Sequence, residues 1–168
     1  MENIYLVGFM GAGKTTVGKL LAQRLDFTFV DIDEIIVSQL NMPITRIFDE
    51  EGESFFRAQE TETLHDISLN SSQVVATGGG VIESTENINI MKSTGVMIFL
   101  DVDWETIQSR ISQNNERPLA IPGDNWISTR KLYENRLSQY RLANITLCSS
   151  DKSVDQLVAD LEDRLLSQ

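Results

Sequence analysis

The chain has 168 residues, of which 25 are acidic and 14 basic, so its formal net charge at neutral pH is −11. This length is typical of one domain, and we expect a single domain over residues 1–168. The negative charge disfavours binding to nucleic-acid backbones and to anionic membrane surfaces. Because no N-terminal stretch resembles a signal and no apolar run approaches the ~20 residues that span a bilayer, we expect a cytoplasmic protein with neither kind of partner.

The first predicted strand, residues 4–7, leads into a glycine-rich loop. Residues 8–15 of this loop are Gly-Phe-Met-Gly-Ala-Gly-Lys-Thr, and a helix with an apolar stripe follows. Glycines let successive backbone N–H groups face phosphate oxygens, and the helix N-terminus adds positive potential. The pattern therefore predicts a polyphosphate site, in which Lys14 reaches the β- and γ-phosphates and Thr15 ligates Mg²⁺.

Two aspartates, Asp31 and Asp33, follow the second predicted strand at residues 27–30. If the backbone is still extended, carboxylates two residues apart point the same way, one toward a metal and the other toward a second substrate. An acidic residue on Mg²⁺, directly or through water, recurs in phosphoryl transfer by such loops. The alternative is that both aspartates only cap the next helix.

A basic and an acidic residue, Arg57 and Glu60, lie three apart in a helix predicted to run to about residue 69. They share one face of the helix, so the carboxylate can hold the guanidinium in one orientation. An oriented arginine suits a carboxylate ligand. Pairs with this spacing are also common on protein surfaces, which is the plain alternative.

Three glycines in succession, Gly78, Gly79 and Gly80, follow the third predicted strand at residues 74–76. Without side chains between them, their backbone amides can approach a ligand directly. The alternative is a flexible turn with no role in binding.

Two further strands, at residues 96–100 and 145–147, complete a pattern of five strands that alternate with helices. This alternation predicts a parallel sheet with helices on both faces and a ligand site beyond the carboxyl ends of the strands. Helix starts are predicted at Ser84, Asp103, Ser128 and Ser153. Cys148, the only cysteine, ends the last apolar run and is expected to be a buried structural thiol.

Residues 114–125 interrupt the alternation with two prolines, a glycine and no helical period. Loops of this length are uncommon in compact domains and often form active-site lids. Within it, Arg117 is a cation suited to close over bound phosphates. An ordinary surface loop is the alternative.

Together these motifs resemble the shikimate kinase family over nearly the whole chain. The matching segments follow in the family's order and spacing: residues 8–18, Asp31-x-Asp33, Phe56-Arg57-x-x-Glu60, Gly78-Gly79-Gly80, Arg117-Pro118-Leu119 and Arg136-x-x-x-Tyr140. The resemblance implies an α/β fold of the P-loop NTPase type, with three layers as in nucleoside monophosphate kinases, a five-stranded parallel sheet, a substrate-binding segment at 33–60 and a lid at 114–125. It also implies a monomer that uses ATP and Mg²⁺ to phosphorylate the 3-hydroxyl of shikimate in chorismate and aromatic amino acid biosynthesis.

The resemblance further implies a role for each site residue. Those for ATP are Gly11, Ala12, Gly13, Lys14, Thr15, Thr16, Arg110 and Arg117. Those for shikimate are Asp33, Phe48, Phe56, Arg57, Gly79, Gly80 and Arg136. Thr15 and, through water, Asp31 would hold the metal, and Lys14, Asp33 and Arg117 would be catalytic.

Two alternatives stay open at this point. The first is a related small-molecule kinase with the same loop, such as a gluconate kinase, although such an enzyme should not need Asp33, Arg57, Gly79 and Arg136 together. The second is a non-catalytic module that senses shikimate or ATP. Sensors of that kind usually carry an attached domain or lose a phosphate-handling residue.

Overall fold

The computed structural model describes residues 2–113 and 125–166. Its sheet has five strands in the order β2-β3-β1-β4-β5, and all four neighbouring pairs are parallel, as predicted. The strands are β1 (Asn3–Val7), β2 (Thr28–Asp31), β3 (Gln73–Ala76), β4 (Gly95–Asp101) and β5 (Ile145–Cys148). Each lies within two residues of its predicted position at either end.

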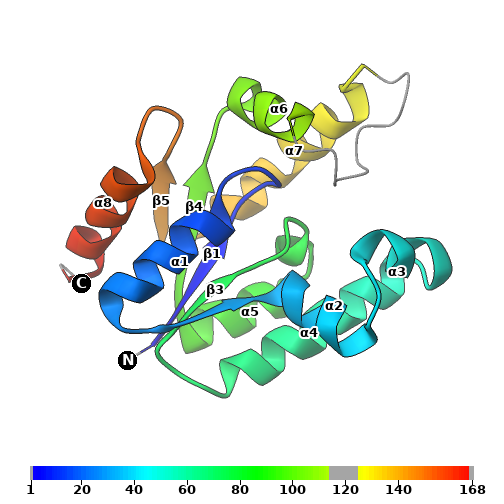
Figure 1. The fold of residues 1–168 in the computed structure, drawn as a ribbon, viewed down its shortest axis with the longest axis horizontal. Coiled ribbons are helices and arrows are strands. Elements are labelled where there is room, and N and C mark those ends of the chain that lie inside the picture. Colours follow the sequence, from blue (N-terminus) through cyan, green and yellow to red (C-terminus); the bar gives the residue numbers. More distant parts are fainter. Residues whose placement is uncertain (1, 114–124, 167–168) are drawn as a thin grey trace.

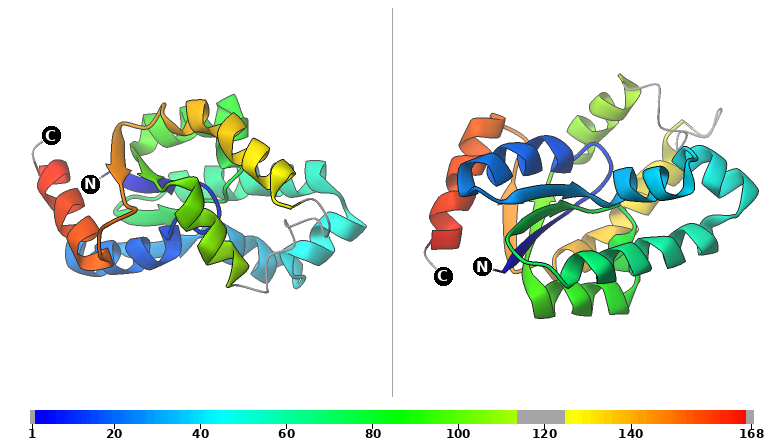
Figure 2. Two further views of the ribbon diagram at one scale, coloured as in Figure 1. Left: turned by 90° about the horizontal axis from the view of Figure 1, so that it is seen from above. Right: turned by 60° about the horizontal axis from the view of Figure 1, so that its bottom comes forward.

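Helices cover both faces of this sheet (Figures 1 and 2), which confirms the predicted three layers. They are α1 (Lys14–Leu25), α2 (Ile32–Leu40), α3 (Ile44–Glu50), α4 (Glu53–Ser68), α5 (Thr85–Thr94), α6 (Trp104–Ser112), α7 (Ile127–Tyr140) and α8 (Val154–Leu166), with a short 3₁₀ turn η1 (Val81–Glu83). Figure 2 shows α1 and α8 on one face and α5 and α7 on the other. Within the ranges that the structure describes, no helix is long and apolar enough to cross a membrane.

The central strand β1 explains why the sheet carries continuous apolar runs. It pairs with β3 on one side and with β4 on the other, and all five of its residues are buried. A strand that is covered on both faces has no solvent side to which alternate residues could point. The glycine-rich loop that follows β1 is therefore anchored to the most buried element of the sheet.

The edge strand β5 differs from this pattern and corrects one expectation. Its residues alternate between buried and exposed, so that Ile145 and Leu147 face the core whereas Thr146 and Cys148 face outward. Cys148 is thus an exposed thiol and not a buried one. The apolar run before it suggested burial, but an edge strand with one covered face alternates with a period of two.

Three of the four predicted helix starts are confirmed by side-chain caps. Ser84 and Asp103 each accept a hydrogen bond from the backbone N–H three residues later, at 3.3 and 2.8 Å. Ser153 does the same at 3.3 Å, and Gln156 returns the contact by accepting from the Ser153 N–H at 2.9 Å. This reciprocal pair satisfies two of the N–H groups that a helix start leaves without intrahelical partners.

The fourth predicted start, at Ser128, is wrong. Helix α7 begins one residue earlier, at Ile127, after Trp126 in the left-handed region with a φ of 69°. The indole of Trp126 packs edge-on against Trp104, with 6.3 Å between ring centroids. The pattern of capping residues carries no information on such a contact.

Gly95 provides a test of strand packing. It pairs with Asn3 of β1, and a Cβ added there would overlap the Asn3 carbonyl oxygen, which is backbone and cannot turn away. We expect Gly95→Ala to lower the free energy of unfolding by about 1–3 kcal/mol, the usual cost of overpacking a core. Urea denaturation should measure this. Ser93→Ala, at an exposed position of α5, is the control and should stay within about 0.5 kcal/mol of wild type.

Candidate active site

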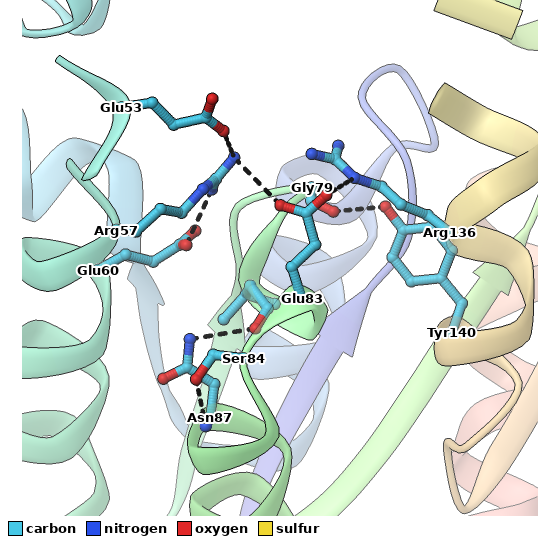
Figure 3. A network of polar contacts seen from close by, with 10 residues as sticks. Glu53, Arg57, Glu60, Gly79, Glu83, Ser84, Asn87, Arg136 and Tyr140 are labelled. Carbon is cyan, nitrogen blue, oxygen red and sulfur yellow. Dashed lines mark hydrogen bonds and ion pairs between the residues drawn. The ribbon is translucent and has the colours of Figure 1, made fainter. Parts of the chain in front are cut away.

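The predicted site residues gather where β1, β2 and β3 end. The glycine-rich loop at residues 8–13 follows β1, Asp31 ends β2, and the triple glycine at residues 78–80 follows β3. Because these strands are parallel neighbours, their carboxyl ends meet at one edge of the sheet. Helix α7 reaches the same edge with Arg136 (Figure 3).

The glycine-rich loop has positive φ angles at three glycines, of which Gly8 has 151°. Gly11 and Gly13 have φ angles of 78° and 93°, in the left-handed region that side chains disfavour. Gly13 is also the N-cap residue, directly before α1 begins at Lys14, and Ala12 is buried. Thr16 is exposed in the first turn of α1. The loop thus places backbone N–H groups and the positive end of α1 together, which suits phosphate oxygens.

Two cationic side chains lie against the same loop. The Lys14 ammonium donates to the carbonyl oxygens of Gly8 and Phe9, at 2.7 and 3.1 Å. From α6, Arg110 Nη1 donates to the carbonyl oxygen of Gly11 at 3.0 Å. Both cations therefore border the anion site, although the chain as a whole carries a charge of −11. For Arg110, the structure gives a place beside the loop backbone, and its contact with adenine stays a prediction.

One carboxylate, that of Asp31, connects the loop to the next helix. Its Oδ2 accepts a hydrogen bond from the Thr15 hydroxyl at 2.8 Å. Its Oδ1 caps α2 by accepting from the backbone N–H groups of Asp33 and Glu34, at 3.1 and 3.4 Å. Capping and a place beside the phosphate site, which the sequence offered as alternatives, therefore occur together. The hydroxyl and carboxylate oxygens are hard ligands of the kind that Mg²⁺ prefers.

Asp33 reaches the site by a different route from the one predicted. The backbone is not extended here, because α2 begins at Ile32, so Asp33 lies in the first helical turn. Its carboxylate points toward the end of β3, where a Cβ added to Gly78 would lie 3.2 Å from Asp33 Oδ1. The same added atom would overlap Glu60 Oε1. Asp33 and Glu60 therefore converge on Gly78.

Glu60 forms the predicted pair with Arg57 and is itself a residue of the site. Arg57 Nη1 donates to Glu60 Oε2 at 2.9 Å, and the Glu60 side chain is fully buried. Burial raises the pKa of the Glu60 carboxyl above its ordinary value; Arg57 opposes this shift and Asp33 adds to it. Glu60 Oε1 has no hydrogen-bond partner among the described residues. Glu60 therefore holds Arg57 from within the protein, and the pair is not a surface ion pair.

The triple glycine makes room for these side chains. A Cβ added to Gly80 would overlap the guanidinium of Arg57, as one added to Gly78 would overlap Glu60. The carbonyl oxygen of Gly79 accepts a hydrogen bond of 2.5 Å from the hydroxyl of Tyr140 (Figure 3). The glycines at positions 78 and 80 are thus explained by the close approach of charged groups, and the alternative of a merely flexible turn is not needed.

Arg136 and Arg57 approach each other across the site, and Glu83 lies between them (Figure 3). Glu83 Oε1 is 3.0 Å from Arg136 Nε, and its Oε2 is 3.8 Å from Arg57 Nη2. The Arg136 side chain is only 7% exposed and lies over the ring of Phe9. Sequence reasoning missed Glu83, because a single acidic residue in a short turn belongs to no recognisable pattern.

Two aromatic rings form an apolar wall beside Arg57. Phe48 from α3 and Phe56 from α4 pack with 4.9 Å between ring centroids. The Arg57 guanidinium carbon lies 5.5 Å from the centre of the Phe56 ring. The structure therefore brings both predicted phenylalanines to the arginine. Arg117 and residues 114–124 of the predicted lid lie outside the described residues.

This chain is similar over nearly its whole length to proteins of one family. The family model described as shikimate kinase matches residues 10–166. The chain is 42% identical over 161 residues to the shikimate kinase of a Sulfurihydrogenibium species, with 96% of both chains covered. It is also 42% identical over 165 residues to that of Persephonella marina, with 98% of this chain and 99% of the relative covered.

Solved structures confirm the predicted kinase fold. Shikimate kinase from Acinetobacter baumannii in complex with shikimate matches with a TM-score of 0.94 at 35% sequence identity. The match covers 99% of this chain and 94% of that one. The glycine-rich loop, the parallel sheet and its flanking helices are therefore those of a P-loop kinase.

The buried carboxyl of Glu60 predicts a specific dependence of stability on pH. Because its pKa is raised above 4.5 in the folded chain, the folded state binds this proton more tightly than the unfolded state does. The stabilising contribution of the protonated Glu60 carboxyl is fully present below the unfolded-state pKa of 4.5, and it is lost as the pH rises through the folded-state pKa. We expect the free energy of unfolding of wild type, relative to Glu60→Gln, to fall as the pH rises from about 4 to about 8.

Urea denaturation at a series of pH values measures this difference. Glu62→Gln removes the same charge from an exposed position of α4 and serves as the control. A difference between wild type and Glu60→Gln that stayed level or grew with pH would contradict the assigned environment of Glu60.

Proposed function

Because this chain belongs to the shikimate kinase family, we propose that it transfers the γ-phosphoryl group of ATP to the 3-hydroxyl of shikimate. The products are shikimate 3-phosphate and ADP, in the route to chorismate and the aromatic amino acids. One observation supports this proposal beyond family membership. At one edge of the sheet, the phosphate-binding loop lies beside two arginines, Arg57 and Arg136, that both face Glu83.

The phosphate half of the site handles ATP. Backbone N–H groups of residues 11–16 and the Lys14 ammonium bind the β- and γ-phosphates, and Arg110 lies close enough to contact the nucleotide. Negative charge spreads over the γ-phosphoryl oxygens in the transition state, so preorganised cations and N–H groups stabilise it more than they stabilise the ground state. Thr15 and, through water, Asp31 would hold Mg²⁺, which would supply neutralisation of negative charge on the phosphates.

The other half of the site binds shikimate. Arg57 and Arg136 pair with its carboxylate, because guanidinium groups match carboxylates in charge and geometry. Gly79 and Gly80 offer backbone contacts. Phe48 and Phe56 cover the apolar side of the ring.

Asp33 is proposed to orient the hydroxyl that attacks. Its carboxylate lies at the end of β3, beside the glycines that bracket the proposed ring position. Bond breaking leads in a loose phosphoryl-transfer transition state, so little base strength is required of Asp33. Orientation of the hydroxyl is therefore its main contribution.

The proposal also extends to the lid and to the surroundings of the enzyme. Arg117, within the predicted lid at 114–125, closes over the transferring phosphoryl group and helps exclude water, which would otherwise accept it. We propose a monomer with a single domain over residues 1–168, in which 33–60 forms the acceptor-binding segment. The location proposed is cytoplasmic, and the charge of −11 disfavours nucleic-acid and membrane partners.

ADP release by the purified protein with Mg-ATP tests the reaction. We compare shikimate, gluconate, AMP and no acceptor, and expect strong stimulation by shikimate alone. Lys14→Ala is the control that should abolish most of the rate, since the ammonium acts on the transferring phosphates. Stimulation by gluconate or AMP would overturn the acceptor assignment. Binding of ATP and shikimate without turnover would instead indicate a sensor.

Substitution of Arg136 tests the acceptor half separately. Arg136→Ala should raise the KM for shikimate roughly 10- to 150-fold, because a charge-assisted hydrogen bond of about 1.5–3 kcal/mol is lost. Arg130→Ala is the matched control, since Arg130 lies on the same helix and pairs with Glu134 at an exposed position. Steady-state kinetics would contradict the assignment if Arg136→Ala changed only the KM for ATP.

A further inference from the structure

We propose that Glu83 is an internal competitor for Arg57 and Arg136, which lowers the affinity of the site for the substrate's carboxylate and for other anions. This inference rests on the proposed binding of that carboxylate by the two arginines. Glu83 belongs to η1, directly after the triple glycine, and its side chain rises between the two guanidinium groups (Figure 3). It is therefore an internal anion at the place where the external one is expected.

The contacts of Glu83 are those of a bridging carboxylate. One oxygen faces Arg136 Nε at 3.0 Å and the other faces Arg57 Nη2 at 3.8 Å. A ligand carboxylate that used both arginines would present its two oxygens in the same way. Since two carboxylates cannot share this position without strong repulsion, the ligand gains the arginines as Glu83 gives up at least part of its contact.

Other residues hold the two arginines in place. Arg57 pairs with Glu60 at 2.9 Å and with Glu53 at 3.2 Å. Arg136 is buried, and its guanidinium lies over the ring of Phe9. Because Glu60, Glu53 and the ring of Phe9 contact the arginines independently of Glu83, we assign the main effect of Glu83 on binding to its charge.

Glu83 also has space into which it can move. Its side chain is 38% exposed and borders an open groove of about 470 Å³ between α4 and α5. The groove is lined in part by Ser54 and Thr61, whose hydroxyls can donate to a displaced carboxylate. Buried Glu60, in contrast, has no such freedom.

The consequence is that simple anions occupy the two arginines only weakly. Any anion must displace Glu83, but only a substrate with ring hydroxyls gains further contacts with Asp33 and with the triple glycine at residues 78–80. Acetate or inorganic phosphate is repelled by the Glu83 carboxylate in the same way, but it makes none of these further contacts. Glu83 thus opposes the binding of every anion, and the contacts with the ring hydroxyls offset this repulsion for the substrate.

Glu83→Gln is the variant that isolates charge. Glutamine keeps the size of the side chain and a carbonyl oxygen that can accept from Arg136 Nε, but it removes the negative charge. We expect the KM and the calorimetric Kd for shikimate to fall roughly two- to five-fold, the range for a partly exposed ion pair. Inhibition by acetate should become stronger, and both effects should shrink at high salt.

Glu86→Gln is the matched control, because Glu86 lies in the exposed first turn of α5 and carries the same charge. It should leave the KM within twofold of wild type, about 0.4 kcal/mol. If wild type turns over shikimate but Glu83→Gln shows an unchanged or raised KM and Kd, the inference about Glu83 is wrong and the proposed function still stands. If wild type gives no shikimate-dependent ADP release, the proposed function and this inference fail together.

Discussion

Charge compensation around Arg57 and Arg136 is the constraint on which the acceptor half of the site depends. Two guanidinium groups are brought toward one point, and one of them is almost fully buried. The two positive charges repel each other, and burial of a charge costs free energy unless the charge is paired. Glu60, Glu53 and Glu83 supply the pairing, and the glycines after β3 supply the space. Each of these features would be unfavourable alone.

The phosphate half depends on a different arrangement, in which backbone and not side-chain charge does most of the positioning. Left-handed glycines and the start of α1 aim N–H groups outward from the most buried strand of the sheet. Asp31 joins the two halves, because one of its oxygens holds Thr15 and the other caps α2. The helix that carries Asp33 is thereby tied to the loop that is expected to hold ATP.

Much of this arrangement follows from the sequence, and the exceptions have physical reasons. The central strands β1, β3 and β4 are largely buried and are continuous apolar runs, and shorter apolar runs marked the edge strands β2 and β5, so all five were found. An i,i+3 spacing on a helix brought Arg57 to Glu60 as expected. Asp33 was placed in the site on an incorrect assumption of extended backbone, because the helix starts immediately after Asp31. Glu83 was missed because tertiary packing alone brings it between two arginines that are distant in sequence. Local patterns carry no information of that kind.

The overlap between Gly80 and Arg57 has a consequence for which sequences this site can accept. An alanine at position 80 would push the guanidinium away from Glu60, so its cost depends on what residue stands at position 57. With a short side chain at 57, the three contacts nearest to the added Cβ would be absent. The two positions are therefore not independent, and the effect of a change at one depends on the residue at the other. Whether position 80 accepts a larger residue is therefore set by the Arg57 side chain of α4, which lies far from the β3 loop in sequence.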